Sequence, residues 1–303
     1  MIVDKRIHLR RLVRGTGGRI VFTAGYAVVV YYLYRTRVVP FAVPIAVPAM
    51  LGTALAILLG FRTNSAYDRW WEARKIWGGI VNDSRTLTRQ VMALFILPDG
   101  ASESDMATLQ RTIVYRQIAW SYMLARILRG QDWSSDVQAT LGASEIDVLR
   151  RQDNGPNAML QFQLVSLREA FQRGYVDSIR LSAVEETLTR LCDSLGKCER
   201  IKNTVFPVHF GFLISLIIWV FLFLLPSGLV TDIGWFAVPI VSVIAAIFLL
   251  IERMAEHLQR PFANLVSDTP MLALSRTIEI NLRQQLGEAE FPEKIKPVDG
   301  VLW

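Results

Sequence analysis

Two long segments without a charged side chain are the strongest constraint on how this sequence can fold. Residues 205–225 and 235–251 contain no Asp, Glu, Lys or Arg, and a short stretch with Pro226, Gly228 and Gly234 separates them. A helix needs about 20 mostly apolar residues to cross the hydrocarbon core of a bilayer. Each segment therefore predicts a transmembrane helix, and the stretch between them predicts a loop.

Two further apolar segments lie nearer the N-terminus, at about residues 20–36 and 41–61. The first is short and ends in a belt of tyrosines before Arg35, and a cleaved signal peptide is the alternative interpretation. Its apolar core is interrupted, however, and no small-residue cleavage site follows before Arg35. We interpret it as a retained helix and predict four transmembrane helices.

The basic residues predict the orientation of these helices. Arg253 and Arg260 follow the fourth apolar segment, whereas the loop between the third and the fourth carries no Lys or Arg. Because cytoplasmic flanks of membrane helices are rich in Lys and Arg, both termini and residues 62–204 are expected in the cytoplasm, with the chain in the inner cell membrane. Arg35 and Arg37 lie on the opposite side and are an exception.

Residues 62–204 read as a soluble helical region. Apolar residues recur at helical spacing along residues 109–123, and the polar stretch 152–156 interrupts the pattern. Residues 252–290 predict further amphipathic helix, and residues 291–303 predict an extended tail. We therefore expect an all-α membrane protein, in which residues 1–303 form one subunit with a large cytoplasmic helical region.

Composition and spacing argue against several classes of function. The net charge is +6, but most basic residues are mixed with acids, which does not favour nucleic-acid binding. Cys192 and Cys198 match no zinc spacing, and no glycine-rich phosphate loop occurs. We predict no enzymatic activity, no cofactor and no metal site. His209 falls inside the third apolar segment, either as a functional ionisable group or as a neutral side chain bonded to the backbone.

The second apolar segment begins with three prolines spaced four residues apart, Pro40, Pro44 and Pro48. Proline inside a helix removes a hydrogen bond and bends the helix. Broken helices survive in a membrane where other protein or a water-filled path satisfies the freed carbonyl groups. We expect this segment not to face lipid on all sides.

The same segment carries two strips at a spacing of four residues. Gly52, Ala56 and Gly60 form a strip of small residues that allows close helix packing, and an adjacent strip consists of Thr53, Ile57 and Phe61. If several copies pack through the small strip, the second strip can line a common axis as stacked rings. Apolar rings of this kind can gate ion flow by dewetting. The alternative is an ordinary helix whose bulky residues face the core of their own subunit.

Charged and aromatic residues follow this segment in a dense run. One interpretation is an interfacial anchor. The run resembles the signature of the bestrophin family, and the residues that carry the resemblance are Arg62, Asn64, Arg69, Trp70, Trp71, Glu72 and Arg74. The pieces Cys198-Glu199-Arg200 with Pro207, Pro261-Phe262 and Asp268-Thr269-Pro270 are similar to further family pieces, chiefly of bacterial members.

The resemblance implies a homopentamer around one axial pore, with a neck at Thr53, Ile57 and Phe61 and a cytoplasmic aperture at Ile179. It implies a passive channel for small inorganic ions, with chloride favoured. A monovalent cation (sodium) channel of the same architecture and a membrane scaffold without flux are the alternatives. Residues 257–262 lack the carboxylates of the calcium site of animal bestrophins, so we predict no calcium site there.

Overall fold

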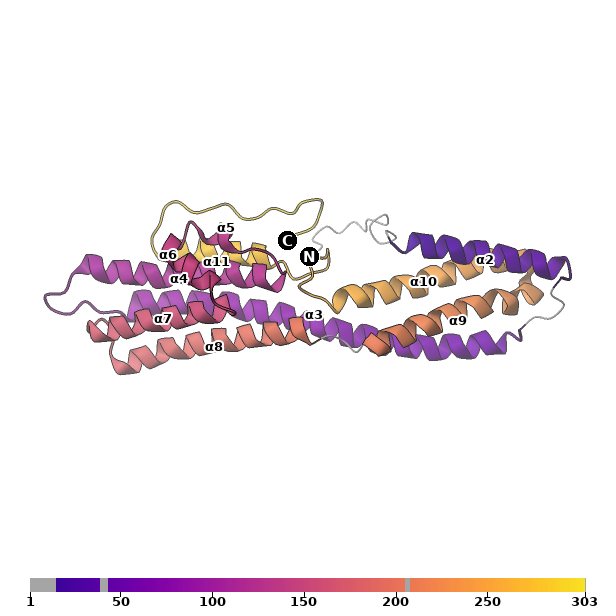
Figure 1. Ribbon diagram of the computed structural model, residues 1–303, viewed down its shortest axis with the longest axis horizontal. Coiled ribbons are helices and arrows are strands. Elements are labelled where there is room, and N and C mark those ends of the chain that lie inside the picture. Colours follow the sequence, from indigo (N-terminus) through magenta and orange to yellow (C-terminus); the bar gives the residue numbers. More distant parts are fainter. Residues whose placement is uncertain (1–14, 39–42, 205–207, 303) are drawn as a thin grey trace. The chain divides into compact units, whose positions relative to one another are not determined.

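The computed structural model describes residues 15–38, 43–204 and 208–302, and every regular element in these ranges is a helix (Figure 1). An isolated β-bridge joins Val298 and Val301 near the end of the chain. The chain divides into two compact units. Of the described residues, those up to 70 and those from 208 to 260 form what we name the apolar unit, and residues 71–204 and 261–302 form the polar unit.

The apolar unit is a bundle around a core of aliphatic and aromatic side chains. It contains α2 (Gly17–Arg35), the first part of α3 (Ala46–Leu94), α9 (Val208–Ile233), the short 3-10 helix η1 (Gly234–Phe236) and α10 (Ala237–Leu258). Helix α2 packs against both α9 and α10. Fully buried side chains at the centre include Leu55, Ile214, Ile218 and Val241.

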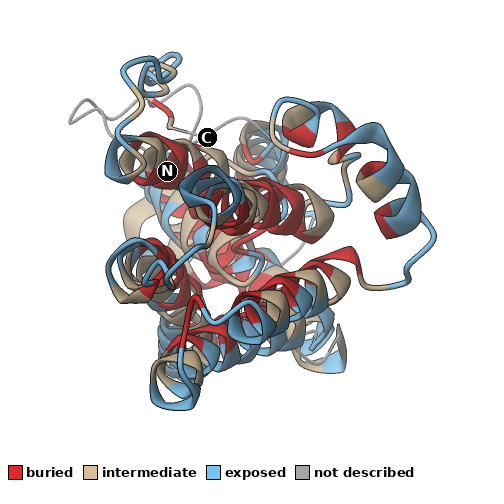
Figure 2. Cartoon of the chain, turned by 90° about the vertical axis from the view of Figure 1, so that its left-hand side faces the viewer, coloured by how far each residue is buried: buried red, intermediate tan, exposed pale blue. Residues whose placement is uncertain are grey.

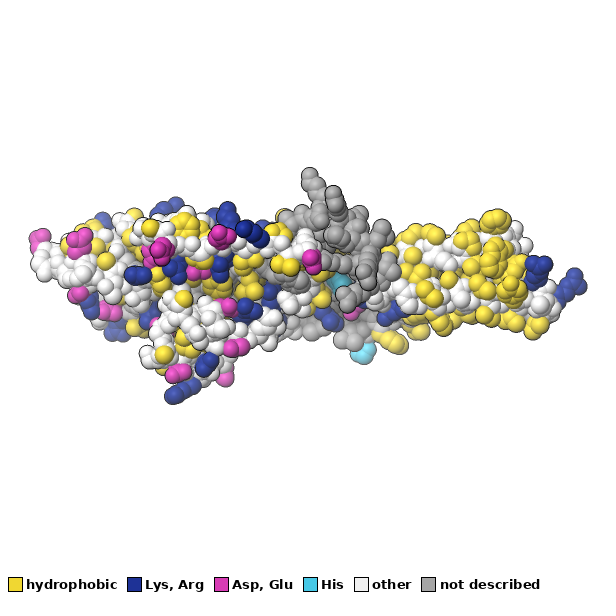
Figure 3. All heavy atoms as spheres, turned by 90° about the horizontal axis from the view of Figure 1, so that it is seen from above, with side chains coloured by type: hydrophobic (Ala, Val, Ile, Leu, Met, Phe, Trp, Pro, Cys, Tyr) yellow, Lys and Arg dark blue, Asp and Glu magenta, His cyan; other side chains and the backbone are white. Residues whose placement is uncertain are grey.

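The outer surface of the apolar unit is also apolar. Large hydrophobic side chains stay exposed on each helix, among them Phe22, Phe212 and Val243. In Figure 3 hydrophobic side chains cover the visible face of this unit, whereas charged side chains are scattered over the polar unit. A bundle that is apolar inside and outside is typical of a protein surrounded by lipid.

Two helical stretches of the described residues are long and apolar enough to cross a bilayer, Ala46–Leu94 and His209–Leu258. The second comprises α9, η1 and α10. Helix α2 is not one of them, because arginines stand near both of its ends and tyrosines interrupt its apolar run. The number of membrane crossings therefore stays a prediction.

Pro44 and Pro48 do not interrupt the second helix. Helix α3 begins at Ala46 and runs for 49 residues without a break. Pro44 precedes it and Pro48 lies in its first turn, where a missing N–H group costs no helical hydrogen bond. Pro40 and Pro207 lie outside the described residues.

The expected loop between the third and fourth apolar segments is also mostly helix. Helix α9 continues through Pro226 to Ile233, and only η1 separates it from α10. The end of α9 packs closely on the start of α3, because a Cβ atom on Gly228 would lie 3.0 Å from Cγ of Pro48. This packing holds the segment in helical form despite its proline and glycine.

The polar unit packs its helices around α4. It consists of the rest of α3, α4 (Glu103–Leu128), α5 (Ser134–Val137), α6 (Ala143–Arg150), α7 (Gly155–Gln172), α8 (Ser178–Asn203) and α11 (Met271–Gln285). Helix α4 contacts α7 and α11. In Figure 2 the buried residues lie on the sides of these helices that face one another. Residues 259–270, expected as amphipathic helix, instead lack an α-helix between α10 and α11.

Three polar side chains inside this core form a chain of hydrogen bonds. Gln117 donates through Nε2 to Oγ of Ser84 at 2.8 Å, and Gln163 donates through Nε2 to Oε1 of Gln117 at 3.0 Å. These contacts connect α3, α4 and α7. Such a chain of hydrogen bonds sets the register of the three helices, since a shift would leave buried amides unsatisfied.

Candidate functional site

The strip Thr53, Ile57 and Phe61 lies on a face of α3 that the rest of the described chain leaves uncovered. Ile57 is 56% exposed and Phe61 is 67% exposed, whereas Leu55 and Leu59 on the same helix are buried. The hydroxyl of Thr53 donates to the carbonyl oxygen of Ala49 at 3.0 Å. These side chains therefore do not contribute to the core of the apolar unit.

The small residues Gly52, Ala56 and Gly60 do not share one environment. A Cβ atom on Gly52 would lie 3.0 Å from Cε2 of Phe221, so Gly52 allows α3 to approach α9 within the apolar unit. A Cβ atom on Gly60 would meet no atom within 4 Å, and Ala56 is exposed. Gly52 therefore packs within the chain, whereas Ala56 and Gly60 leave their part of the small strip uncovered.

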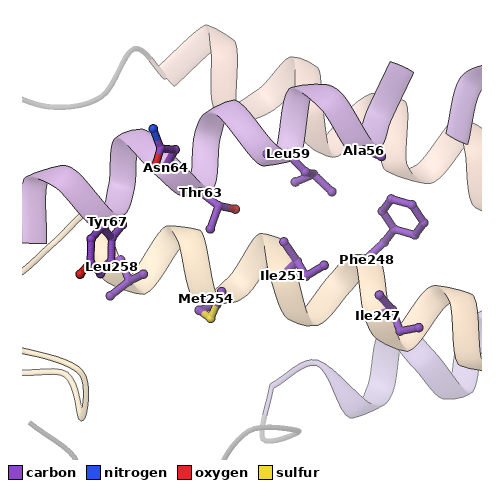
Figure 4. A pocket seen from close by; sticks show the side chains of 11 residues that line it. Ala56, Leu59, Thr63, Asn64, Tyr67, Ile247, Phe248, Ile251, Met254 and Leu258 are labelled. Carbon is purple, nitrogen blue, oxygen red and sulfur yellow. The ribbon is translucent and has the colours of Figure 1, made fainter. Parts of the chain in front are cut away.

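Ala56 and Gly60 border an apolar groove of about 690 Å³ between α3 and α10. Figure 4 shows side chains of both helices around this space, with Leu59 on α3 and Ile251 on α10. Polar atoms are contributed by Thr63, Asn64 and Tyr67 of α3. The groove lies beside the exposed strip, because Ala56 adjoins Ile57 and Gly60 adjoins Phe61 along α3.

Ile179 lies in the first turn of α8, in the polar unit, and its side chain is 82% exposed. The preceding corner is well fixed. Tyr175 and Val176 are buried, the carbonyl oxygen of Tyr175 accepts from the backbone N–H of Ile96 at 2.8 Å, and the side chain of Asp177 caps the helix. The large apolar side chain of Ile179 is thus exposed to solvent at a position that the surrounding backbone fixes.

The signature residues are divided between the two units. Asn64, Arg69 and Trp70 belong to the apolar unit with Arg62, and Trp71, Glu72 and Arg74 belong to the polar unit. Within the polar unit the carboxylate of Glu72 accepts a hydrogen bond from Nη2 of Arg200, which ties α3 to α8. Trp71 is 44% exposed.

The partner of Arg62 does not follow from the sequence. Its side chain is 7% exposed, and Nη1 lies 3.9 Å from Oε1 of Glu252 on α10. On the other side, Nη1 of Arg19 on α2 lies 3.8 Å from Oε2 of Glu252. One feature of the sequence could have indicated this group. Arg19, Arg62 and Glu252 are each the charged residue that borders an uncharged helical stretch.

Titratable groups of the polar unit include a buried acid. Asp268 is 1% exposed, and burial raises the pKa of its carboxyl to about 6, although backbone N–H groups and Arg129 oppose this. Burial also raises the pKa of the Cys198 thiol to about 12, so this thiol stays protonated. No three His, Cys, Asp or Glu side chains of the described ranges cluster in a way that could hold a metal ion. His209 is exposed in the first turn of α9.

Comparisons with known proteins agree on one group. The profile of the bacterial and fungal bestrophin proteins matches residues 7–284. The voltage-dependent anion channel-forming protein YneE of Escherichia coli K12 is 33% identical over 250 residues, which cover 82% of this chain and 79% of that protein. A voltage-dependent anion channel-forming protein of Nostoc sp. PCC 7120 is 29% identical over 264 residues, covering 87% of this chain and 84% of the relative.

Solved structures give the same picture. The crystal structure of a bacterial bestrophin homologue from Klebsiella pneumoniae superposes with a TM-score of 0.83 at 27% sequence identity. The match covers 90% of this chain and 98% of the other. The crystal structure of a membrane protein that carries a glycine-to-alanine substitution has a TM-score of 0.84, also at 27% identity and with the same coverage of both chains.

Proposed function

This chain belongs to the bacterial and fungal bestrophin family, and from that membership we propose that it forms a passive anion channel in the cell membrane. Relatives about one third identical are named as anion channel-forming proteins. A channel-forming family carries out no reaction, so the chain is not an enzyme. The work of the protein is to lower the cost of moving an ion through the bilayer.

The proposed pore is lined by α3 in a homopentamer. The observation that carries this proposal is the exposure of Ile57 and Phe61 on a helix whose opposite face, with Leu55 and Leu59, is buried. An outward-facing apolar strip is also compatible with lipid. The family membership favours a position of this strip at the symmetry axis of the pentamer. Five copies of Thr53, Ile57 and Phe61 would form three stacked rings there.

The groove beside the strip supports the same assembly. Helices associate in membranes through small residues that allow close approach, and Ala56 and Gly60 leave this space open. We propose that α3 of the neighbouring subunit occupies the groove. Each subunit would then cover the groove of the next, as a closed ring requires.

Chloride is the proposed ion. The strip carries no carboxylate that would attract a cation, and the edges of the Phe61 rings are electropositive. The apolar surface would strip water from the ion and so limit the flux. Ile179 is proposed as a second apolar ring at the cytoplasmic exit. A sodium channel of the same architecture remains the alternative.

Four membrane helices are proposed, with both termini and the polar unit in the cytoplasm. The support is the basic pair Arg253 and Arg260 after the fourth apolar segment, against a turn between α9 and α10 without Lys or Arg. Helices α2, α9 and α10 and the first part of α3 would then form the membrane part of each subunit.

Flux through purified protein in liposomes tests the proposal. Vesicles loaded with potassium chloride are diluted into potassium gluconate, and chloride efflux is recorded with an electrode. Sodium uptake under an imposed gradient is measured in parallel. Chloride efflux above that of empty vesicles is expected. Sodium flux without chloride flux would favour the cation channel, and no flux of either ion would favour a scaffold.

A further inference from the structure

Two arginines lie against a single carboxylate at one end of the apolar unit, and a third arginine follows that carboxylate in the sequence. The guanidinium groups of Arg62 and Arg19 lie on either side of Glu252, at 3.9 and 3.8 Å. The guanidinium of Arg253, next to Glu252 in sequence, packs on Gly15, where a Cβ atom would lie 3.0 Å from Nη2. Three positive groups and one negative group leave this cluster with an excess of positive charge.

Arg62 is the unusual member of this cluster. It is 6% exposed, and its Nε and Nη1 atoms are buried without a hydrogen-bond partner. A distance of 3.9 Å to Glu252 is an electrostatic contact, too long for a hydrogen bond. Buried guanidinium N–H groups are almost always hydrogen-bonded, so this arrangement indicates a missing acceptor.

The position of the cluster indicates what that acceptor is. Arg19 precedes the uncharged stretch of α2, Arg62 follows that of α3, and Glu252 and Arg253 follow that of α10. All of them therefore mark the same boundary of the apolar unit. In a bilayer this is the depth of the lipid head groups, where arginine side chains meet phosphate.

We propose that Arg19, Arg62 and Arg253 bind a phosphate group, supplied by an anionic phospholipid of the cytoplasmic leaflet. The phosphate oxygens accept hydrogen bonds from Nε and Nη1 of Arg62, and guanidinium groups match phosphate geometry well. Arg19, whose side chain is 54% exposed, forms the entrance. Glu252 keeps the arginines in place when no phosphate is bound.

Thermal unfolding of the full-length protein in detergent tests this site. The probes are phosphatidylglycerol, phosphatidylcholine and sodium phosphate, the last against sodium chloride at equal ionic strength. Phosphatidylglycerol at ~100 times its Kd should raise the Tm of the unmodified protein by about 5 °C. A shift with phosphatidylglycerol alone identifies the lipid, and an equal shift with inorganic phosphate identifies the free anion as the source.

Variants separate this site from general attraction of charged lipid. Arg19→Gln should lose at least half of the shift, whereas Arg35→Gln, which removes the same charge at the other end of α2, should keep it. The double variant Arg62→Gln/Glu252→Gln removes the buried pair without a net charge change and should also lose the shift.

Two results would overturn the proposal. They are a lipid-induced Tm shift that is equal in the unmodified protein and in Arg19→Gln, and the absence of a Tm shift with either phosphate source. Chloride flux in vesicles of phosphatidylcholine alone tests the channel independently, so failure of one proposal does not imply failure of the other.

Discussion

Arg62 of α3 and Glu252 of α10 face each other at 3.9 Å, where both helices leave their uncharged stretches. Both residues are more than nine-tenths buried. Water reaches little of either side chain, so each charge depends on the other for compensation. This pair connects α3, which carries the strip Thr53, Ile57 and Phe61, to α10. It thereby restricts rotation of α3 about the helix axis.

Glu252→Gln should destabilise the protein by about 3 kcal/mol, because it leaves the Arg62 charge buried without a carboxylate. Denaturant unfolding in detergent without added lipid measures this. Glu256→Gln, on the exposed side of the same helix, is the control and should change little. Equal stability of the two variants would mean that the Arg62–Glu252 pair contributes nothing to the free energy of unfolding.

Gly52→Ala and Gly60→Ala should differ in what they disturb. The new methyl group at Gly52 would lie 3.0 Å from the buried ring of Phe221, which should cost about 1–3 kcal/mol of subunit stability. At Gly60 the methyl group meets no atom of its own subunit, but it narrows the groove proposed for the neighbouring subunit. Native mass spectrometry should show loss of oligomer for Gly60→Ala. Intact oligomers would argue against the groove as an interface.

Phe61→Ala should raise chloride conductance, because it removes the bulkiest of the three proposed rings. Its effect on subunit stability should be small, since the side chain is 67% exposed. Phe212→Ala on α9 is a matched control, with a side chain 68% exposed outside the strip. Single-channel recording in planar bilayers compares them. Identical currents in both variants would place the pore elsewhere.

Ile179→Ala should raise conductance or change selectivity while the protein stays stable, because the side chain is 82% exposed. A core isoleucine truncated to alanine would instead cost about 2–5 kcal/mol. Leu191→Ala, fully buried on the same helix, provides that comparison. Unchanged current together with a clearly lower Tm of Ile179→Ala would show a packing role and no aperture.

Asp268 should make stability depend on pH. Burial raises its carboxyl pKa from 3.8 to about 6, so the folded state holds this proton more tightly than the unfolded state does. The stabilisation is complete below about pH 4 and is lost as the pH rises through 6, by up to about 3 kcal/mol.

Asp268→Asn should therefore remove this decline and melt at a higher temperature than the unmodified protein at pH 7. Melting temperatures from pH 4 to 8 measure the effect, with Asp193→Asn, an exposed position, as the control. A decline that persists in Asp268→Asn would assign it to another group.

Much of the candidate site could be predicted because it depends on local spacing. Residues four apart on a helix share a face, so the strip Thr53, Ile57 and Phe61 follows from the sequence once α3 is helical. The signature after Phe61 and the family it indicates are likewise a matter of sequence alone. The partner of Arg62 could not be found this way, since Glu252 is distant in the chain and only the tertiary structure brings the two side chains together.

The sequence by itself determined that this is an all-helical membrane protein of the bestrophin family, because uncharged stretches of about 20 residues have few other stable environments. Only the tertiary structure decided where α9 ends and which glycines pack inside the chain, because residue propensity and spacing do not determine these features. Pro226 and Gly228 favour a loop by propensity, yet α9 passes through both, since Gly228 lets the helix pack on Pro48. Gly52 and Gly60 are equivalent in spacing, and only the position of Phe221 assigns the first to the interior of the subunit and leaves the second open. Propensity and spacing act within a few residues, whereas these outcomes depend on contacts between segments far apart in the chain.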